Sequence, residues 1–422
     1  MTRDVVIIGA GQAGGRAAEA LRKVGFDAPV FLVGEEDRPP YERPPLSKSV
    51  LTGKSDAGAA ALFGPEFYDE NRIELVIGTR VTRIDPAARK VELAGRAALS
   101  YGHLLICTGG RVRELDFADR RLSGLHYLRT AADAEALRDS MARAGRMVVV
   151  GGGFLGLEVA ASARAFGIEV TVIEGAPHLL DRVLPPAIAE RIAALHVRQG
   201  VTLRLGCPVV GIRAEGGAVT SVETADGRSV PADVVVVAAG IVPNVELAAD
   251  AGLQIGNGVV VDEFCRTAAP GILAAGDVAN HPNALLGRRL RLESWQNAQN
   301  QAIAAAKTIG GQGAPYAEIP WFWSDQYDMN IQVVSVPPAT DATVLRGDPE
   351  SGHFTCLSLF EGAVVGATAF NMGKEVRAAR MLIEHRLHVA PAELADTSVR
   401  LRDIAEKHLA AVPADRASEM IR

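Results

Sequence analysis

Two stretches of the sequence decide the fold, and the first reads Asp4-Val-Val-Ile-Ile-Gly9-Ala-Gly11-Gln-Ala-Gly14. The second begins its glycine motif 142 residues later (Gly9 to Gly151) and reads Met147-Val-Val-Val-Gly151-Gly-Gly153-Phe-Leu-Gly156. In each stretch an apolar run of strand type leads into G-x-G-x-x-G and then into a helical pattern. The chain therefore repeats one strand–loop–helix unit.

An acidic residue comes after each glycine motif, at the end of a second apolar run. Glu35 lies 21 residues past Gly14, and Glu174 lies 18 residues past Gly156. Glycines let the backbone approach a pyrophosphate, the helix N-terminus supplies N–H groups, and an acid about 20 residues on accepts a ribose hydroxyl. Because the whole pattern occurs twice, we predict two Rossmann-like dinucleotide-binding domains of the α/β class.

From about residue 320 the sequence pattern changes from alternating strands and helices to a run of strands. Strand-like segments occur at 330–334, 354–360 and 363–366, and a helical pattern succeeds them over 374–385. We interpret this part of the chain as a C-terminal α+β domain.

Composition excludes several classes of function. The 44 basic residues are outnumbered by 50 acidic ones, so a general nucleic-acid footprint is not expected. No run of about 18 apolar residues suggests a membrane span, and no signal peptide is visible, so we expect a cytoplasmic protein. The four cysteines match no zinc, iron–sulfur or C-x-x-C spacing, so we expect reduced thiols and no metal site. They are Cys107, Cys207, Cys265 and Cys356.

Eight stretches carry a family resemblance. They are Pro40-Tyr-Glu-Arg-Pro-Pro-Leu-Ser-Lys48, Cys107-Thr-Gly-Gly110, Tyr127-Leu-Arg-Thr130, Gly151-Gly-Gly-Phe-Leu-Gly-Leu-Glu158, Ala239-Gly-Ile-Val-Pro-Asn244, Gly276-Asp277, Glu293-Ser-Trp-Gln-Asn-Ala298 and Pro320-Trp-Phe-Trp-Ser-Asp-Gln326. On these motifs the chain resembles, over essentially its whole length, the oxygenase-coupled NADH–ferredoxin reductases, which feed Rieske-type dioxygenases and bacterial cytochromes P450. The resemblance implies FAD at the first dinucleotide site and NADH at the second.

The resemblance also implies an order of domains. Residues 1–112 and 241–318 would form a discontinuous FAD-binding domain. Residues 113–240 would form the NADH-binding domain, and residues 319–422 the C-terminal α+β domain.

Lys48 and Glu158 are the residues to which the resemblance gives catalytic roles, beside the flavin and the nicotinamide. From the residues alone, Lys48 fits a surface position after a proline-rich turn, and Glu158 fits a first helical turn favoured by the helix dipole. A buried carboxylate needs a partner, and Lys48 would supply it. We predict that the two form a catalytic pair that aligns the nicotinamide against the flavin.

Other residues are expected to bind the cofactors. Glu174 would accept ribose hydroxyls and repel a 2′-phosphate, which favours NADH, whereas Arg182 could approach the ribose or pyrophosphate. Asp277 fits the ribityl chain of FAD or, equally, a turn cap, and Ser294 is expected to cap a helix beginning at Trp295 near the flavin. The full set that the resemblance implies is Gly9, Gly11, Ala13, Gly14, Glu35, Arg43, Lys48, Val81, Thr108, Gly109, Arg129, Asp277, Trp295, Gly151, Gly153, Leu155, Gly156, Glu158, Glu174, Arg182 and Gly240.

The expected partner is an acidic 2Fe-2S ferredoxin that docks transiently. Lys374, Arg377 and Arg380 recur on one helical face, which is either a docking patch or an ordinary solvated face. A second basic cluster comprises Arg288, Arg289 and Arg291. The alternating Trp321 and Trp323 face one side of a strand, as core residues or beside the electron exit route.

Three other classes share the fold. Flavoprotein disulfide reductases and NADH peroxidases need a redox cysteine shortly after the first acid, and residues 36–56 contain none. An apoptosis-inducing-factor-like flavoprotein is expected to carry a targeting segment and a broadly basic surface, and neither is visible. A rubredoxin reductase stays open as an alternative.

Overall fold

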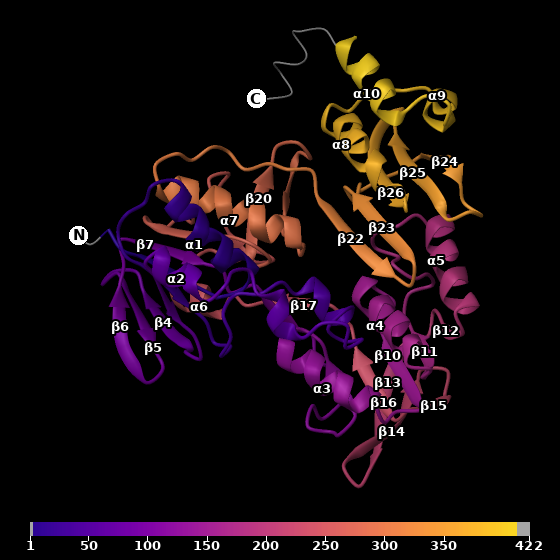
Figure 1. The fold of residues 1–422 in the computed structure, drawn as a ribbon, viewed down its shortest axis with the longest axis horizontal. Coiled ribbons are helices and arrows are strands. Elements are labelled where there is room, and N and C mark those ends of the chain that lie inside the picture. Colours follow the sequence, from indigo (N-terminus) through magenta and orange to yellow (C-terminus); the bar gives the residue numbers. More distant parts are fainter. Residues whose placement is uncertain (1–2, 412–422) are drawn as a thin grey trace. The chain divides into compact units, whose positions relative to one another are not determined.

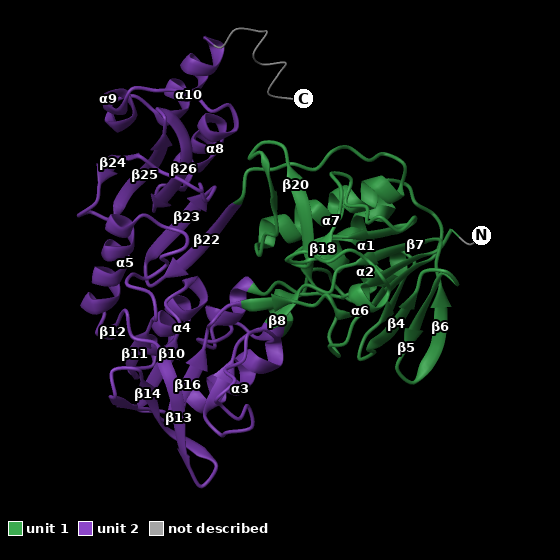
Figure 2. Cartoon of the chain, turned by 180° about the vertical axis from the view of Figure 1, so that it is seen from behind, with its two compact units in different colours: residues 1–43, 58–111, 241–320 green, residues 44–57, 112–240, 321–422 purple. Residues whose placement is uncertain are grey.

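The chain forms two compact units in the computed structural model, which describes residues 3–411. The first unit comprises residues 1–43, 58–111 and 241–320, and the second comprises 44–57, 112–240 and 321–422 (Figure 2). Each unit contains one of the two glycine motifs. Within residues 3–411, no helix combines the length and the apolar character that crossing a membrane requires.

A five-stranded parallel sheet forms the centre of the first unit. Its order is β19–β7–β1–β2–β3, with β1 (Val5–Ile8) in the middle. The other strands are β2 (Val30–Val33), β3 (Ile73–Val76), β7 (His103–Ile106) and β19 (Ile272–Ala274). All four residues of β1 are buried, as expected for a parallel strand covered on both faces. The predicted first Rossmann-like fold is present.

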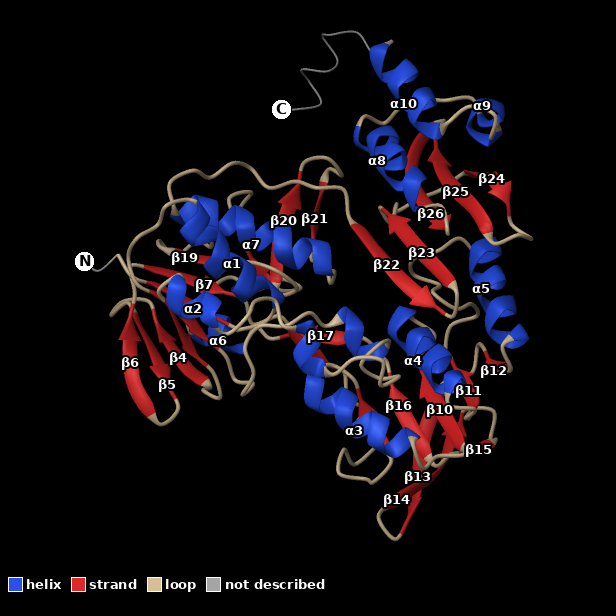
Figure 3. Ribbon diagram, in the orientation of Figure 1, coloured by secondary structure: helices blue, strands red, loops and turns tan. Residues whose placement is uncertain are grey.

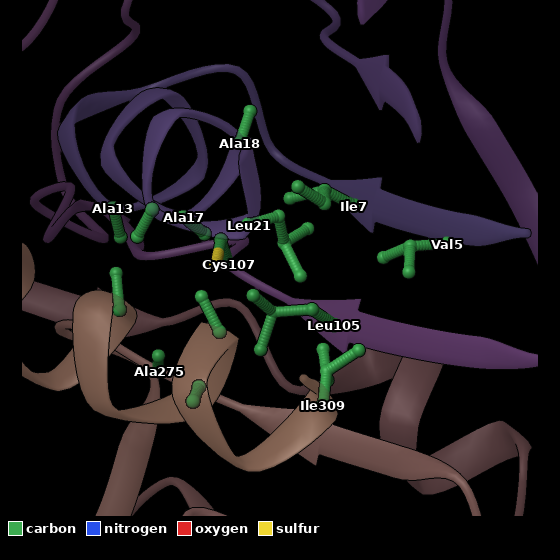
Figure 4. Packing of buried hydrophobic residues seen from close by; sticks show 14 of the residues in the cluster. Val5, Ile7, Ala13, Ala17, Ala18, Leu21, Leu105, Cys107, Ala275 and Ile309 are labelled. Carbon is green, nitrogen blue, oxygen red and sulfur yellow. The ribbon is translucent and has the colours of Figure 1, made fainter. Parts of the chain in front are cut away.

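Helices α1 (Gln12–Lys23) and α7 (Trp295–Ile309) pack together on one side of this sheet. Figure 4 shows Ala13, Ala17 and Leu21 of α1 pointing towards Ala275 and Ile309 across a dry cluster. Small side chains on α1 allow this close approach of backbone to backbone. A second cluster lies under the three-stranded antiparallel sheet of β4 (Val81–Asp85), β5 (Lys90–Leu93) and β6 (Arg96–Ser100).

The second unit contains the other parallel sheet, in the order β12–β11–β10–β16–β9. Its strands are β9 (Leu125–Tyr127), β10 (Arg146–Val150), β11 (Glu169–Ile173), β12 (Val201–Arg204) and β16 (Val234–Val237). Three helices, α3 (Ala131–Met141), α4 (Phe154–Ala165) and α5 (Pro186–Arg198), accompany it (Figure 1). In both sheets the strand before the glycine motif is central and pairs with the next strand of its own unit, so the internal repeat is structural.

An antiparallel sheet forms the C-terminal part, in the order β22–β23–β26–β25–β24 (Figure 3). The strands are β22 (Trp321–Gln326), β23 (Met329–Val334), β24 (Ala342–Asp348), β25 (His353–Phe360) and β26 (Ala363–Phe370). Helix α8 (Val376–Glu384) packs on β26 and β23, and α9 (Pro391–Ala395) and α10 (Leu401–Ala410) come after it. The predicted helix over 374–385 is thus confirmed, with a short 3-10 turn, Gly373–Glu375, at its start.

Remaining elements are small. The first unit also has α2 (Glu66–Glu70), α6 (Glu246–Asp250) and a sheet of β18 (Val259–Val260), β20 (Ala279–Asn283) and β21 (Arg288–Leu290). The second has a sheet of β13 (Val209–Glu215), β14 (Ala218–Thr224) and β15 (Ser229–Pro231). Strands β8 (Gly110–Val112) and β17 (Ile241–Pro243) form a two-stranded sheet of their own.

A buried ion pair holds the C-terminal helices to their sheet. Arg346 of β24, whose side chain is 3% exposed, donates from Nε to Glu375 Oε1 at 2.6 Å. Thr355 donates to the other carboxylate oxygen at 2.6 Å. The rest of the guanidinium donates to backbone carbonyls of the segment around α9, namely those of Leu394, Asp396 and Val399. One cation therefore fixes both Glu375 and the path of the chain towards α10.

We expect Arg346→Met to destabilise the protein strongly, because it leaves the Glu375 carboxylate buried without its cation. Breaking such a pair costs about 3–5 kcal/mol. Arg402→Met removes an exposed pair with Glu406 on α10 and is expected to cost less than about 0.5 kcal/mol. Urea titrations followed by circular dichroism measure both losses, and equal losses would contradict this interpretation.

Candidate active site

Close packing in the first glycine loop leaves no room for a side chain at Gly9 or Gly14. A Cβ on Gly9, whose φ is +109°, would lie 2.2 Å from the Cys107 carbonyl oxygen, and one on Gly14 would lie 1.9 Å from the Gly9 oxygen. At Gly11, the N-cap of α1, an added Cβ would meet no heavy atom within 4 Å, and no side chain caps the helix. The first N–H groups of α1 therefore face open space, which suits the pyrophosphate of a dinucleotide.

The second loop repeats this geometry. A Cβ on Gly151, whose φ is +113°, would lie 2.5 Å from the Ala238 oxygen, and one on Gly156 would lie 2.2 Å from the Gly151 oxygen. Gly153, the N-cap of α4, again has open space around it and no side-chain cap. The side chain of Leu155, in the first turn, stays 37% exposed. This loop also fits a dinucleotide. We refer to the glycine loop at residues 9–14 with the start of α1 as the first cradle, and to the loop at residues 151–156 with the start of α4 as the second cradle.

Glu174 lies directly after β11, at the mouth of the second cradle. Its carboxylate accepts the backbone N–H of Gly152 at 2.6 Å and that of Ala176 at 2.8 Å. Two N–H groups fix the carboxylate, and each oxygen keeps a lone pair with which to accept a ribose hydroxyl. Arg182 is exposed on the loop that leads to α5. The predicted ribose-binding role of Glu174 is compatible with this geometry and stays a prediction.

The first cradle has two neighbouring acids in place of one. Glu35 is 68% exposed and forms an ion pair with Arg80 at 3.2 Å. Glu36 accepts from Arg43 at 2.8 Å and from the Tyr41 hydroxyl at 2.5 Å. Spacing alone selected Glu35, and only the structure shows that its neighbour organises the segment beginning at Tyr41.

Acidic neighbours, Asp277 among them, determine the charge state of Arg43. Burial alone would lower the pKa of Arg43, but Tyr41, Glu36 and Asp277 outweigh it, so the pKa is raised and the guanidinium stays charged. Arg291 donates to the Asp277 carbonyl at 3.1 Å and pairs with Glu293 at 2.7 Å. Arg291, which the sequence grouped with a basic cluster, therefore braces the Asp277 loop.

Further expected FAD-binding residues have defined places in the first unit. Thr108 donates to the Asn244 carbonyl at 2.8 Å, and the Asn244 amide donates back to the Thr108 carbonyl at 2.9 Å. Gly109 next to them has a φ of +59°. Ser294 caps α7 by accepting the Asn297 N–H at 3.2 Å, as predicted, so that Trp295 begins the helix. Ala13 lies in α1, and Val81 begins β4.

In the second unit, two more expected positions lie in loops. The Arg129 N–H donates to Asp133, the residue that forms a capping box with Thr130 at the start of α3. Gly240 has a φ of +91° and accepts the Arg113 N–H at 2.9 Å. Binding roles for both stay predictions.

Lys48 and Glu158, far apart in sequence, form an ion pair. Lys48 Nζ lies 3.0 Å from Glu158 Oε1, and Nζ also donates to the Pro44 carbonyl at 3.2 Å. Glu158 is buried in the second turn of α4, not in the first turn as predicted, so it lies beyond the turn in which the helix dipole favours negative charge. The 3-10 turn Pro44–Ser47 delivers the lysine to it. The structure brings together the two residues predicted as a catalytic pair.

Serine hydroxyls complete the environment of Glu158. Ser47 donates to Oε2, and Ser324 of β22 donates to Oε1 at 2.7 Å. Ser162, one turn further along α4, donates to the Ser47 carbonyl at 2.7 Å. Sequence reasoning missed all three serines. Strand alternation could have revealed one, because it places Ser324 on the face opposite the two tryptophans.

Comparison with known proteins identifies the family. The pyridine nucleotide-disulphide oxidoreductase family matches residues 3–302, and the reductase C-terminal family matches residues 321–405. The ferredoxin–NAD(+) reductase component of the anthranilate 1,2-dioxygenase system of Burkholderia cepacia is 47% identical over 399 residues, which cover 94% of this chain and 98% of that protein.

Solved structures agree with this result. The ferredoxin reductase for the CYP199A2 system from Rhodopseudomonas palustris matches with a TM-score of 0.93 at 38% identity, covering 96% of this chain and 100% of that chain. Putidaredoxin reductase in its covalent complex with putidaredoxin matches with a TM-score of 0.93 at 37% identity, covering 96% and 99%. The chain belongs to the oxygenase-coupled ferredoxin reductase family. The resemblance and the fold class are confirmed, and membership implies FAD and a nicotinamide dinucleotide as cofactors.

A groove of about 640 Å³ lies on the C-terminal part of the reductase, between β22, β23 and α8. Trp321, Arg377 and Arg380 are among its lining residues. Trp321 stacks on Trp323, with ring centres 5.2 Å apart and planes at 21°, and donates from Nε1 to Gln332 at 3.0 Å. The groove thus combines one aromatic side chain, Trp321, with two cations of the predicted basic face.

The buried cysteines of the reductase are unsuited to disulfide chemistry. All four cysteines of the chain are free, and Cys107 lies buried under the Gly9 turn. Burial raises the pKa of the Cys107 thiol and raises that of Cys265 to about 12. Such thiols stay protonated and unreactive near neutral pH.

We expect Gly153→Ala to weaken nucleotide binding without harming the fold. The new methyl group meets no protein atom, so the unfolding free energy should change by less than about 1 kcal/mol. It would intrude on the pyrophosphate, so NAD⁺ affinity should fall about tenfold. Calorimetric titration and thermal melting measure these quantities. Gly156→Ala, which clashes with Gly151, should instead destabilise the protein, and unchanged NAD⁺ affinity in Gly153→Ala would refute the cradle.

Proposed function

We propose that the reductase transfers electrons from NADH, through FAD, to an acidic 2Fe-2S ferredoxin that supplies a terminal oxygenase. The observation that carries the proposal is the buried Lys48–Glu158 pair, whose acid lies two residues past the last glycine of the second cradle, in a chain with no cysteine over residues 36–56. When bound, FAD supplies the chemistry that accepts a hydride and releases electrons singly. The protein supplies binding, orientation and electrostatics.

The second cradle holds the coenzyme in this proposal. Free N–H groups at the start of α4 bind the pyrophosphate, and the Glu174 carboxylate accepts hydroxyls of the adenosine ribose. The coenzyme is thereby anchored at one end, so its nicotinamide is presented near the first turns of α4, where Glu158 lies. Anchoring of this kind converts remote binding energy into orientation of the reacting group.

Lys48 and Glu158 act as an oriented charge pair. Glu158 accepts from Lys48, Ser47 and Ser324, so its carboxylate is fixed in direction. Lys48 is restrained between that carboxylate and the Pro44 carbonyl, and a fixed cation stabilises an electron-rich ring beside it without reorganising. The pair therefore aligns the nicotinamide and favours electron transfer to the flavin.

Glu174 also decides which coenzyme is used. An NADPH 2′-phosphate would approach a carboxylate already fixed by two N–H groups, and such like-charge contact is costly. We therefore propose NADH as the physiological donor.

We expect NADH to be favoured over NADPH by at least about tenfold in kcat/KM, which corresponds to about 1.4 kcal/mol. Glu174→Ser combined with Gly175→Arg should narrow that ratio, and the structure has room for a side chain at Gly175. Glu169→Ser removes an exposed carboxylate from the same strand, β11, and should leave the ratio unchanged. Steady-state kinetics with both coenzymes give the answer, and equal use by the unmodified enzyme would contradict the assignment.

The groove of the C-terminal part is the proposed docking face for the ferredoxin. Trp321 offers an aromatic contact, and Arg377 and Arg380 offer positive charge on a protein whose net charge is −6. A local basic patch steers an acidic partner and raises its association rate. The similar structure of putidaredoxin reductase with bound putidaredoxin supports a partner of this class.

Coupled reduction of cytochrome c tests the function. NADH should drive rapid reduction only when an acidic 2Fe-2S ferredoxin is added, and Arg377→Glu should raise the KM for ferredoxin about tenfold. Arg143→Glu makes the same charge change on the loop after α3 and serves as the control. Flavin reduction by NADH should stay unchanged in both variants. Reduction of rubredoxin in preference to ferredoxin would instead favour the rubredoxin reductase alternative.

A further inference from the structure

Strand β22 has two faces with different surroundings. Trp321 and Trp323 stack on one face. On the other, Phe322 packs edge-on against Phe154 of α4 at 5.2 Å, and Ser324 and Gln326 are fully buried. The second face therefore lies against the helix that carries Glu158.

A buried line of hydrogen bonds starts from this face and ends on Glu158. Tyr327 Oη lies 3.2 Å from His196 Nδ1, and His196 Nε2 lies 2.9 Å from Gln326 Oε1. Gln326 Nε2 donates to Ser324 Oγ at 3.1 Å, and Ser324 Oγ donates to Glu158 Oε1 at 2.7 Å. We refer to His196, Gln326 and Ser324 as the Glu158 relay.

Every proton in the relay points towards Glu158. The Gln326 carbonyl can only accept, so His196 carries its hydrogen on Nε2, and Nδ1 is left to accept from the tyrosine. The Gln326 amide group donates to Ser324, whose own hydrogen is then directed to the carboxylate. Bonds aligned in this way strengthen one another. Burial lowers the pKa of His196, in agreement with the neutral tautomer that the relay requires.

Burying a polar group costs free energy unless the group is hydrogen-bonded. Here three buried polar side chains, His196, Gln326 and Ser324, form one chain of hydrogen bonds that ends on a single oxygen of Glu158. Oε2 of Glu158 is held separately by Ser47, and Oε1 is shared by Lys48 and Ser324. Removing Ser324 would leave Oε1 with Lys48 as its one remaining partner among those described here. The relay thus determines how firmly the carboxylate is oriented.

We propose that Ser324, Gln326 and His196 are positioning residues for hydride transfer, because they fix the Glu158 carboxylate from β22. This inference rests on the proposed function. None of the three contacts the coenzyme in this proposal, and each acts through Glu158 and so through Lys48.

Ser324→Ala is the direct test, read by stopped-flow bleaching of the flavin at varied NADH. The limiting rate should fall about tenfold, because sub-ångström misplacement of an aligning group is enough to slow such a step. The NADH concentration at half-saturation should stay nearly constant. Ser324→Thr keeps the donor hydroxyl and should restore most of the rate. Ser358→Ala deletes a buried hydroxyl of β25 and should leave the rate unchanged.

A double-mutant cycle separates positioning from mere stability. In a Glu158→Ala background, Ser324→Ala should cause no further loss, because the relay no longer has its acceptor. Additive losses, or an unchanged rate in Ser324→Ala, would overturn the inference. If Ser324→Ala does not retain flavin, Gln326→Met takes its place; it cuts the same relay and should slow reduction about threefold, and no slowing would again overturn it.

The same data distinguish the two levels of the proposal. An unmodified protein whose flavin is not reduced by NADH would overturn the proposed function and the inference together. An unmodified protein that is reduced rapidly, with a Ser324→Ala variant equally fast, would overturn the inference alone.

Discussion

The burial of one carboxylate, that of Glu158, is the constraint on which this part of the molecule depends. An ionised group taken out of water must be compensated, and a single cation rarely suffices. Here the compensation comes from Lys48 and from the hydroxyls of Ser47 and Ser324. Segments 44–48 and 321–326 are thereby tied to the start of α4 by charge as well as by apolar contact.

The two cradles share one backbone geometry but continue into helices with different residue types. Both loops exclude side chains at the turn and leave the helix N-cap open. Their helices differ beyond the glycine motif: α1 continues with alanines that pack tightly on α7, whereas α4 places Glu158 in its second position after the motif. The repeat therefore preserves the backbone geometry of the glycine loop and varies the residue types on the helix.

Much of this could be predicted from the sequence, because the rules involved are local. The glycine motifs, the strand runs and the Ser294 cap are each recognised within a few residues, and the structure has them where they were expected. The relay could not be predicted, because it joins α5, β22 and α4 across more than 160 residues, as in the Ser324–Glu158 bond. The ion pair of Glu36 with Arg43 could not be predicted for a related reason: spacing locates the end of β2 but not the approach of a residue later in the chain. The bond from Arg291 to the Asp277 carbonyl could not be predicted either, because nothing in the sequence near Arg291 signals it.

Strand β22 carries two sets of side chains with separate surroundings. Side chains alternate between its faces, so the odd-numbered positions 321 and 323 lie on the face whose Trp321 lines the groove, and even-numbered ones such as 322 and 324 contact α4. An engineer could rebuild the odd set to suit a new protein acceptor while leaving the even set intact. Inserting a single residue would exchange the two sets at once, so the parity of this strand, more than any one side chain on it, is the property that such a redesign has to keep.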